Sequence, residues 1–296
     1  MGLEDRIKTF ARIRLMMLAS AVSPVLNTQL NFLMKTGRLG DLREPESFSE
    51  KLSWLKLNRY ADDPLVRRCA DKRLVRDYVE EKGLGHMLIP LIGVYKHPED
   101  IPWEELPESF ALKWNFACGF NLICRDKQKL DIPAAVKRLK KWEKTKFWLY
   151  YAEFQYKNIE RYILCEQFLD HDENEGLLDY KFYCFHGRPL AVLVVARYEN
   201  GDKAAMLMSP EWEVLSDIPS RYEKSIVPPR PEGLEEMLRA AEVLSRPFPF
   251  VRVDLYEHEG KALFGELTFT PGAGVGPSET DIDGKSMGEL IELRDI

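Results

Sequence analysis

The sequence predicts an α+β protein whose sheets are mostly antiparallel. Two pairs of strand-like segments are each joined by a short turn, which is how antiparallel neighbours connect. Helical segments are interspersed among the strands and do not alternate with them one for one, as they do in parallel α/β folds. Of the 296 residues, 45% are hydrophobic and 30% are charged, with 18 Gly and 18 Pro. This is the composition of a globular protein, and it excludes collagen, coiled coil and disorder.

For the first 34 residues, the sequence does not decide between packing on the rest of the molecule and contact with a membrane. Basic residues at positions 6, 8, 12 and 14 precede an uncharged stretch from Leu15 to Met34. Pro24 divides that stretch, so we expect two short helices that meet there. Its Ser, Asn and Gln side chains would be unpaired inside a bilayer, which argues against a membrane span. The apolar faces then either pack on the body or make a peripheral membrane contact through residues 1–34.

The elements that follow are read from apolar spacing and turn signals. Helical spacing runs from Pro45 to Val79, and Ser47 with Glu50 has the spacing of a capping box that starts a helix. We expect strands over Leu88–Val94, Phe110–Lys113, Arg161–Phe168, Tyr180–Phe185 and Leu190–Tyr198, with a turn at 186–189 joining the last two. A helix over Glu232–Leu244 precedes a second hairpin, formed by Val251–Tyr256 and Ala262–Leu267 with its tip at 258–260.

Charge and cysteine content indicate which partners and which compartment to expect. The net charge is −6, whereas a protein that coats nucleic acid normally carries a basic excess, so we expect no nucleic-acid partner. The five cysteines are sparse and contain no CxxC pair, which is typical of reduced thiols in a cytoplasmic protein. Basic residues cluster at 137–146, either as a solvated helix face or as a surface for an anionic substrate or headgroup.

The second predicted hairpin carries polar residues at alternate positions. Arg252 and Asp254 share one face of their strand, as do Glu266 and Thr268 of theirs. If the strands pair through the tip, both polar pairs converge, and buried carboxylates and guanidinium groups need compensating charges. Mg²⁺ prefers a few carboxylates together with phosphate oxygens, and Arg binds phosphate with paired hydrogen bonds. The alternative is a solvent-facing strand pair with a chance salt bridge.

Two further segments offer cations. A strand ends with Lys113 before a loop that contains the small residues Ala117, Cys118 and Gly119. Such a loop can bring an ammonium group and backbone N–H groups around phosphates, although an ordinary turn would look the same. Lys72 and Arg76 are four residues apart at an expected helix start, a spacing that places them on one face.

In order along the chain, these pieces resemble the ATP-grasp superfamily. The matching segments are Asp71-Lys72, Leu106–Lys113, Cys165–Leu169, Val253–Tyr256 and Gly265–Gly272. Within that superfamily the chain looks like the TupA-like ATP-grasp proteins of surface polysaccharide (teichuronopeptide-type) biosynthesis. That narrower resemblance rests on 48–54, 179–185 with Gly187, and 264–269, and it covers roughly residues 45 to 290.

The resemblance implies a fold in which two antiparallel-sheet subdomains clasp ATP behind a helical N-terminal segment. It implies three regions: 1–60 is helical, 61–165 is the first ATP-grasp region including the lid, and 166–296 is the C-terminal region with the metal site. Acceptor recognition in many relatives belongs to an α/β domain that precedes the grasp, and the helical segment stands in its place.

The resemblance also implies a role for each site residue. Lys72 and Lys113 would contact ATP phosphates, and Asp179 would lie near the ribose. Glu166, Gln167, Phe168 and Leu169 would form the linker that holds adenine. Arg252 and Lys181 would act on the transferring phosphate, and Asp254, Glu266 and Thr268 would bind Mg²⁺. Thr268 stands where many members have Asn, and Trp114-Asn115-Phe116 departs from their Gly-rich loop.

Three functions remain open from the sequence. The first is a carboxylate–amine ligase that uses ATP and Mg²⁺ and works through an acyl phosphate on a small-molecule or saccharide carboxylate. The second is a kinase of a sugar or polyol hydroxyl, and the third is a non-catalytic ATP-binding protein. We expect a cytoplasmic protein, either free or at the inner face of the membrane.

Overall fold

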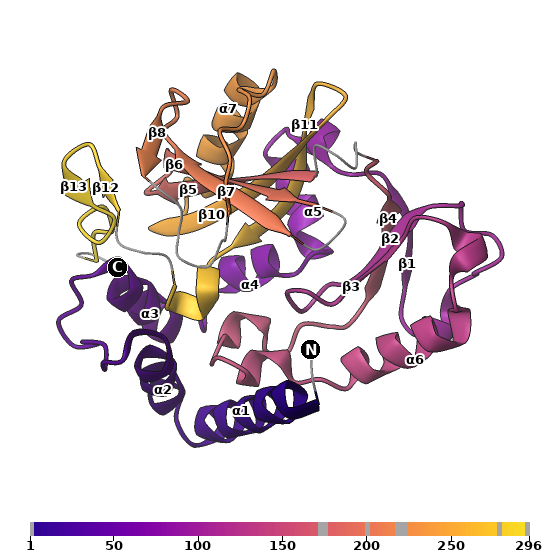
Figure 1. The fold of residues 1–296 in the computed structure, drawn as a ribbon, viewed down its shortest axis with the longest axis horizontal. Coiled ribbons are helices and arrows are strands. Elements are labelled where there is room, and N and C mark those ends of the chain that lie inside the picture. The colour runs from indigo at the N-terminus through magenta and orange to yellow at the C-terminus, as the bar shows by residue number, and fades with distance from the viewer. Residues whose placement is uncertain (1–2, 171–176, 199–201, 217–223, 277–279, 294–296) are drawn as a thin grey trace.

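Two sheets form the frame of the protein (Figure 1). The computed structural model describes residues 3–170, 177–198, 202–216, 224–276 and 280–293. The smaller sheet has the order β1-β4-β2-β3, made of β1 (Leu91–Tyr95), β2 (Phe110–Trp114), β3 (Asn121–Cys124) and β4 (Ile163–Gln167). The larger sheet has the order β11-β10-β5-β6-β7-β8, and β9 pairs with β7. Its strands are β5 (Leu177–Phe185), β6 (Arg188–Arg197), β7 (Lys203–Met208), β8 (Val214–Ser216), β9 (Lys224–Ser225), β10 (Phe250–His258) and β11 (Lys261–Thr268).

Helices surround these sheets. The α-helices are α1 (Leu3–Val22), α2 (Pro24–Thr36), α3 (Phe48–Asn58), α4 (Pro64–Ala70), α5 (Leu74–Glu81), α6 (Ile132–Glu143) and α7 (Leu234–Ser245). Short 3-10 helices are η1 (Gly85–Met87), η2 (Pro98–Asp100), η3 (Lys127–Lys129), η4 (Phe147–Leu149), η5 (Phe154–Tyr156) and η6 (Pro271–Gly274). A small ribbon, β12 (Asp281–Ile282) with β13 (Lys285–Ser286), lies near the C-terminus. The described part of the chain thus confirms an α+β protein with antiparallel sheets and a helical N-terminal segment.

The larger sheet is covered on one face by α7 and packs on α3 at the other. Cys184 of β5 contacts the Ala241 carbonyl of α7. Phe48 of α3 makes ring contacts with Tyr183, Phe185 and Phe250, with centroids 5.1 to 6.4 Å apart. Burying such rings stabilises the packing of helix on sheet. Along β5, the face that meets α3 therefore also carries Asp179 and Lys181, four and two residues before Tyr183.

Both predicted hairpins are present. In the first, β5 and β6 are joined at His186-Gly187, and in the second β10 and β11 are joined at Glu259-Gly260. All four turn residues have positive φ, between 48° and 80°, which two-residue hairpin turns require. The first expected strand is shorter than predicted, since η1 and Pro90 delay β1 until Leu91. The sequence does not predict β3 or the strands β7 to β9 as separate elements, whereas α6 overlaps the basic stretch 137–146, for which a helix face is one of the two expectations.

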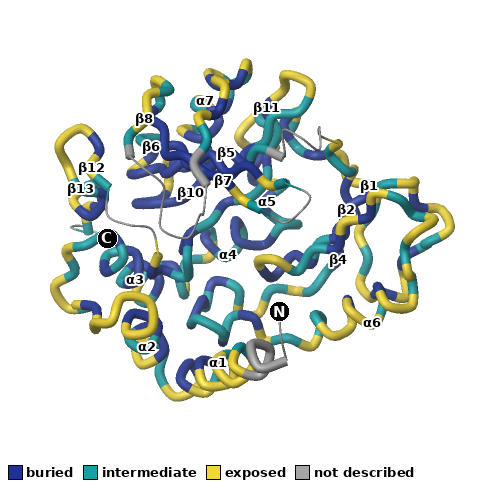
Figure 2. Tube along the Cα trace, viewed as in Figure 1, coloured by how far each residue is buried: buried dark blue, intermediate teal, exposed yellow. Residues whose placement is uncertain are grey.

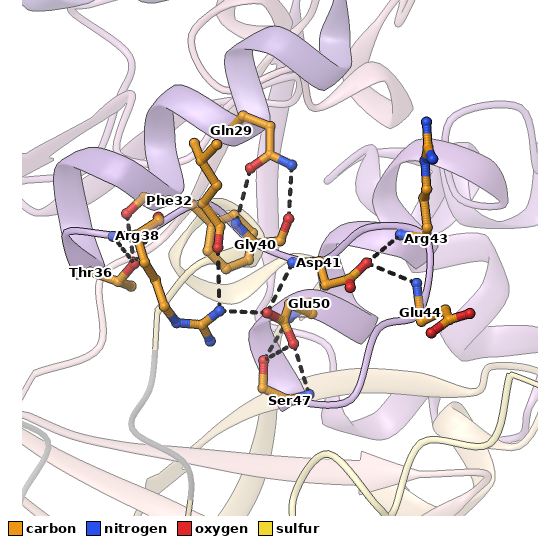
Figure 3. A network of polar contacts seen from close by, with 11 residues as sticks. Gln29, Phe32, Thr36, Arg38, Gly40, Asp41, Arg43, Glu44, Ser47 and Glu50 are labelled. Atoms are coloured by element: carbon orange, nitrogen blue, oxygen red, sulfur yellow. Dashed lines mark hydrogen bonds and ion pairs between the residues drawn. The ribbon is translucent and has the colours of Figure 1, made fainter.

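The connection from α2 to α3 is a polar network (Figure 3). The Gln29 side chain donates to the Gly40 carbonyl (2.8 Å) and accepts from its N–H (3.0 Å). Glu50 accepts from Arg38 Nη1 (2.7 Å), from the Asp41 N–H (3.0 Å), and from both the N–H and the hydroxyl of Ser47 (3.1 and 2.7 Å). The capping box predicted at Ser47 and Glu50 is therefore confirmed, and it also fixes the preceding loop.

Candidate functional site

The strand register brings the polar residues of β10 and β11 together. Arg252 is paired with Thr268, and Asp254 is paired with Glu266 on one side and with Lys181 of β5 on the other. The register shifts between Asp254 and Leu255, which leaves Gly265 as the extra residue of a β-bulge. A Cβ atom at Gly265 would lie 2.9 Å from the Asp254 carbonyl oxygen, so the bulge requires glycine. The expected convergence of both polar pairs on one face is present.

These residues form a continuous set of ion pairs, here called the site array: Lys72, Asp179, Lys181, Arg197, Arg252, Asp254, Glu266 and Thr268. Arg252 donates to both oxygens of Asp254 at 2.6 Å, and Lys181 Nζ lies 2.9 Å from Asp254 Oδ2. Asp179 Oδ2 lies 3.2 Å from Lys181 Nζ and 2.7 Å from Arg197 Nε.

Thr268 links Arg252 to Glu266 within the array. Its hydroxyl accepts from Arg252 Nη2 at 3.2 Å and donates to Glu266 Oε1 at 3.3 Å. Asp254 and Arg252 are buried, with side chains 3% and 10% exposed, whereas Glu266 is 30% exposed. Glu266 is thus the carboxylate that an incoming ligand reaches first.

Lys72 connects the larger sheet to the loop after β2. Its Nζ lies 3.1 Å from Glu266 Oε2 and donates to the Ala117 carbonyl at 2.9 Å. Its N–H donates to the Asn115 carbonyl at 3.1 Å. The sequence predicts a helix start at Lys72. In the structure Lys72 lies in the turn between α4 and α5 instead. The turn allows one lysine to be anchored to the loop through its backbone while its ammonium group reaches Glu266.

Asn115 has a structural role that explains why Trp114-Asn115-Phe116 stands where related proteins have a Gly-rich loop. Its amide Nδ2 donates to Asp71 Oδ1 (2.8 Å) and to the Glu160 carbonyl (2.8 Å), and its Oδ1 accepts from the Tyr162 N–H (2.8 Å). Asp71 Oδ1 also accepts from the N–H groups of Arg73 and Leu74 at the start of α5. A buried asparagine with these partners fixes the base of the loop to the turn that carries Lys72.

Lys113 and Glu166 form a second group, on the smaller sheet. Their side chains are 18% and 9% exposed, and Lys113 Nζ lies 2.6 Å from Glu166 Oε2. Arg76 of α5 lies 3.2 Å from Glu166 Oε1 and also donates to the Ile89 carbonyl. The sequence reading placed Arg76 on the face of Lys72, and nothing local indicated that it pairs with a residue 90 positions away.

The segment after Glu166 leaves the smaller sheet for the larger one. The N–H of Gln167 donates to the Pro90 carbonyl at 3.0 Å, and its side chain is exposed. The Phe168 ring lies 5.5 Å from the Arg125 guanidinium, and Leu169 is half-buried. Since β4 and β5 belong to different sheets, the segment is a linker between them, as expected. Residues 171–176 of the linker lie outside the described residues.

Neighbouring cations keep the site carboxylates ionised. Burial by itself would raise the pKa of Glu266, but Lys72, Lys181 and Arg252 outweigh it and lower the pKa to about 2. Burial would also raise the pKa of Asp179, yet Lys181 and Arg197 hold it below its ordinary value. The pKa of Lys72 is raised, because Glu266 and its other anionic neighbours outweigh the opposing effect of burial. All these groups are therefore charged at neutral pH.

Positive charge exceeds negative charge across the site. The two groups together hold six cationic side chains (Lys72, Arg76, Lys113, Lys181, Arg197 and Arg252) against four carboxylates (Asp179, Glu166, Asp254 and Glu266). The whole chain, in contrast, carries a net charge of −6. Five of the six cationic side chains are 18% exposed or less, whereas Arg197 is 44% exposed. Largely buried cations that lack a full set of counter-charges are unfavourable until an anion joins them. The arrangement suits a polyanionic ligand.

The donors at this site fit a magnesium ion that is bound together with phosphate. Asp254, Glu266 and Thr268 offer carboxylate and hydroxyl oxygens, the hard ligands that Mg²⁺ prefers. Among the described residues, no group of three or more His, Cys, Asp and Glu side chains could hold a metal ion. Mg²⁺ is commonly bound through one or two carboxylates and completes its shell with substrate phosphates and water. The residues therefore fit an ion shared with a nucleotide better than a metal cage made by protein alone.

The loop that follows β11 is held by residues that the sequence reading missed. Lys35 of α2 donates to the Gly272 and Val275 carbonyls (both 2.6 Å), and Lys56 of α3 donates to the Ala273 carbonyl at 3.1 Å. Gly272, Ala273 and Gly274 have φ of 62°, 62° and 84°, an unusual run of left-handed residues. Burial lowers the pKa of Lys56 to about 8, against the opposing charge of Glu153. Nothing in the sequence around Lys35 or Lys56 indicates that these lysines hold a distant loop.

A cavity of about 860 Å³ opens beside this loop. It lies between α2, α3 and residues 286–289, and Val275 and Gly276 form part of its wall. Both signs of charge line it, including Lys35, Arg38 and Glu289. The described part of the helical segment thus meets the loop after β11 at a polar cavity.

No curated protein matches the chain. Among solved structures, the D-alanine–D-alanine ligase from Bacillus anthracis complexed with ATP is 15% identical, with a TM-score of 0.44; the match covers 82% of this chain and 72% of that one. D-cycloserine synthetase DcsG is also 15% identical, with a TM-score of 0.42 and coverage of 77% and 74%.

The family assignment rests on a comparison with family models. The model of the TupA-like ATP-grasp family matches residues 50–292. This range includes both sheets and every residue of the site array, and it begins at Glu50, the residue that closes the capping box. The chain belongs to the TupA-like ATP-grasp family.

Proposed function

We propose that the protein is an ATP- and Mg²⁺-dependent carboxylate–amine ligase that works through an acyl phosphate. The observation that carries the proposal is the surplus of positive charge over the two groups, six cationic side chains against four carboxylates, around the facing pair Asp254 and Glu266. A nucleoside triphosphate supplies the missing negative charge, and membership of an ATP-grasp family supports that choice of polyanion.

The nucleotide would lie between the two sheets. In this proposal Lys72 and Lys113 exchange their carboxylate partners for phosphate oxygens, and the linker 166–169 holds adenine. Asp179 Oδ1 is buried and has no hydrogen-bond partner among the described residues. A buried acceptor without a donor is costly, so a ribose hydroxyl would satisfy it.

Asp254, Glu266 and Thr268 would hold the magnesium ion at the phosphates. When bound, the ion would neutralise charge on the transferring phosphoryl group and align it for in-line transfer. Arg252 is already fixed by two hydrogen bonds to Asp254. Its guanidinium can therefore stabilise the charge that develops during transfer without further reorganisation, and Lys181 lies beside it to assist.

The reaction follows from the poor reactivity of a free carboxylate. Attack of a carboxylate oxygen on the γ-phosphorus forms an acyl phosphate and releases ADP. The amine then attacks the acyl carbon, loses a proton, and expels inorganic phosphate to leave an amide. No side chain of the protein is needed as a covalent nucleophile. We propose a uronic-acid-type carboxylate of a surface polysaccharide or its precursor, and an amino acid or another small amine, at the cytoplasmic face of the membrane.

Trapping with hydroxylamine tests the reaction. The protein incubated with ATP, Mg²⁺ and candidate uronic acids should form a hydroxamate and an equal amount of ADP. Glu266→Gln and Asp254→Asn should abolish both products while the circular dichroism spectrum is unchanged; Glu44→Gln, an exposed carboxylate, is the matched control. A phosphate ester without hydroxamate would instead identify a kinase. Nucleotide binding without turnover of any acceptor would favour the non-catalytic alternative.

A further inference from the structure

Exposed apolar side chains gather on the N-terminal helices. Of the fifteen exposed large apolar side chains in the described part of the chain, nine lie within residues 10–39. They are Phe10, Leu15, Leu18, Val22, Val25, Leu26, Leu33, Met34 and Leu39. Scattered single apolar residues on a surface are normal, but such a concentration marks an interaction site.

The opposite face of these helices is already fixed to the protein. Met16, Ala19 and Ser20 are buried, and the Ser20 hydroxyl donates to the Leu149 carbonyl at 2.6 Å. The Asn27 amide donates to the carbonyls of Met16 (2.7 Å) and Tyr150 (3.2 Å), which joins α1, α2 and the segment after η4. Packing on the body is one of the two expected arrangements. It explains the buried inner face of α1 and α2 but not their exposed outer face.

The outer face of α1 is apolar at helical spacing. Leu15, Leu18 and Val22 are three and four residues apart, so they share a face, and their side chains are 52%, 67% and 79% exposed. Figure 2 shows α1 along one edge of the molecule, with exposed and buried residues along the coloured part of the helix. The described helices contain none that is long and apolar enough to cross a membrane. An exposed apolar face of this kind is suited to lying on a surface.

Basic residues accompany the apolar stripe. Glu4 and Asp5 lie in the first turn of α1, but the sequence has no acidic residue between Asp5 and Asp41, although the chain as a whole is acidic. Arg12 and Arg14 are exposed on α1 beside the stripe. Lys35 and Arg38 bind backbone carbonyls and Glu50. Exposed arginines beside an apolar stripe suit an anionic headgroup layer, which attracts basic residues near its surface.

We propose that α1 and α2 form a docking surface for the anionic face of a lipid bilayer. Leu15, Leu18 and Val22 would enter the boundary between headgroups and acyl chains, and Arg12 and Arg14 would meet lipid phosphates. The helices would lie in the plane of the membrane with their inner faces still packed on residues 149 and 150. This surface does not depend on the proposed reaction, so the two can fail separately.

Vesicle sedimentation tests the surface with the full chain. Wild-type protein should sediment with phosphatidylcholine vesicles that contain phosphatidylglycerol, and much less with phosphatidylcholine alone. Leu15→Ser/Leu18→Ser/Val22→Ser should reduce binding by about tenfold or more, since three aliphatic side chains no longer leave water. Arg12→Gln/Arg14→Gln should reduce binding about fivefold per residue at low salt and weaken its salt dependence. Ile123→Ser/Val214→Ser, two side chains 50% exposed on the sheets, is the control that should bind as wild type.

Three results would overturn the proposal. One is wild-type protein that stays in solution with anionic vesicles. Another is unchanged binding by the Leu15/Leu18/Val22 variant with a native circular dichroism spectrum. The third is a concentration-dependent dimer in sedimentation velocity, lost in the same variant and accompanied by no vesicle binding. That last result would show that a second copy of the chain covers the face.

Discussion

At the scale of single residues, Glu50 fixes the start of α3 and the loop before it. Its two oxygens accept four hydrogen bonds, from Arg38, Asp41 and Ser47. Burial by itself would raise the pKa of Glu50, but these donors lower it to about 2. Because the folded state binds the proton less tightly than the unfolded state, the stabilisation is complete above pH 4.5 and is lost as pH falls towards 2.

This residue gives a prediction that depends on pH. Glu50→Gln should lower the free energy of unfolding at pH 7 by about 3 kcal/mol, the linkage equivalent of its pKa shift. The difference from wild type should shrink as pH falls below 4.5, because a protonated Glu50 loses the same charge-assisted bonds. Urea unfolding at several pH values measures it, with Glu44→Gln as the exposed control. A difference that does not change with pH would contradict the linkage.

Lys72 and Lys113 give a second prediction at this scale. If they bind phosphate, Lys72→Met or Lys113→Met should weaken ATP binding by about 1 to 3 kcal/mol, the range for a lost charge-assisted hydrogen bond. Isothermal titration calorimetry measures the affinity. Lys129→Met is the control, because that side chain is 83% exposed. Unchanged affinity in both variants would show that the two lysines serve only their carboxylate partners.

At the scale of elements, the loop after β11 joins the site to the helical segment. Its carbonyls are held by Lys35, Lys56 and Ser53, so it keeps a run of left-handed residues that a free loop would avoid. The strand that carries Glu266 and Thr268 therefore ends at a fixed point on α2 and α3.

Two glycines of that loop allow a matched test. Gly272→Ala should cost about 1 to 2 kcal/mol, because a left-handed φ of 62° opposes a side chain, although its Cβ would make only an ordinary contact with Lys35 Nζ at 3.8 Å. Gly274→Ala should cost more, because its Cβ would also lie 3.1 Å from Ser53 Oγ. Urea unfolding of both variants ranks them. Equal stabilities would mean that the loop yields without disturbing α3.

Sequence reasoning succeeded where the signal is local. The capping box at Ser47, the two hairpin turns and the alternation of Arg252 with Asp254 depend on neighbours within a few residues, and all are present. The pairing of Arg76 with Glu166 depends on packing between distant elements, as do the contacts of Lys56 and Lys35 with the loop. No spacing in the sequence encodes such contacts. The region boundaries and the roles of the site residues stay predictions.

At the scale of the molecule, two separate cores lie under the two sheets. One includes the larger sheet with α3, α4, α5 and α7, and the other includes the smaller sheet with α6. Lys72 spans from one body to the other through Glu266 and the Ala117 carbonyl. A ligand bound at this junction would therefore stabilise both bodies together.

Thermal unfolding tests that junction. ATP with Mg²⁺ should raise the midpoint by several degrees, since a ligand at 100 times its dissociation constant adds about 2.7 kcal/mol. The shift should be lost in Lys72→Met/Lys113→Met and retained in Lys129→Met. A shift of equal size in the double variant would place the nucleotide elsewhere.

The bulge at Gly265 offsets the register of the β10–β11 hairpin by one residue. Leu255 to His258 pair with Phe264 to Lys261 on the side of the turn, and Arg252 to Asp254 pair with Thr268 to Glu266 on the side of the site. The second set is also fixed by β5 and by the glycine that lies against the Asp254 carbonyl, so we expect a change in length at the Glu259-Gly260 turn to be absorbed near the turn. The turn is thus a place where a fluorescent label or a short peptide can be inserted as a reporter, while the two carboxylates keep facing each other.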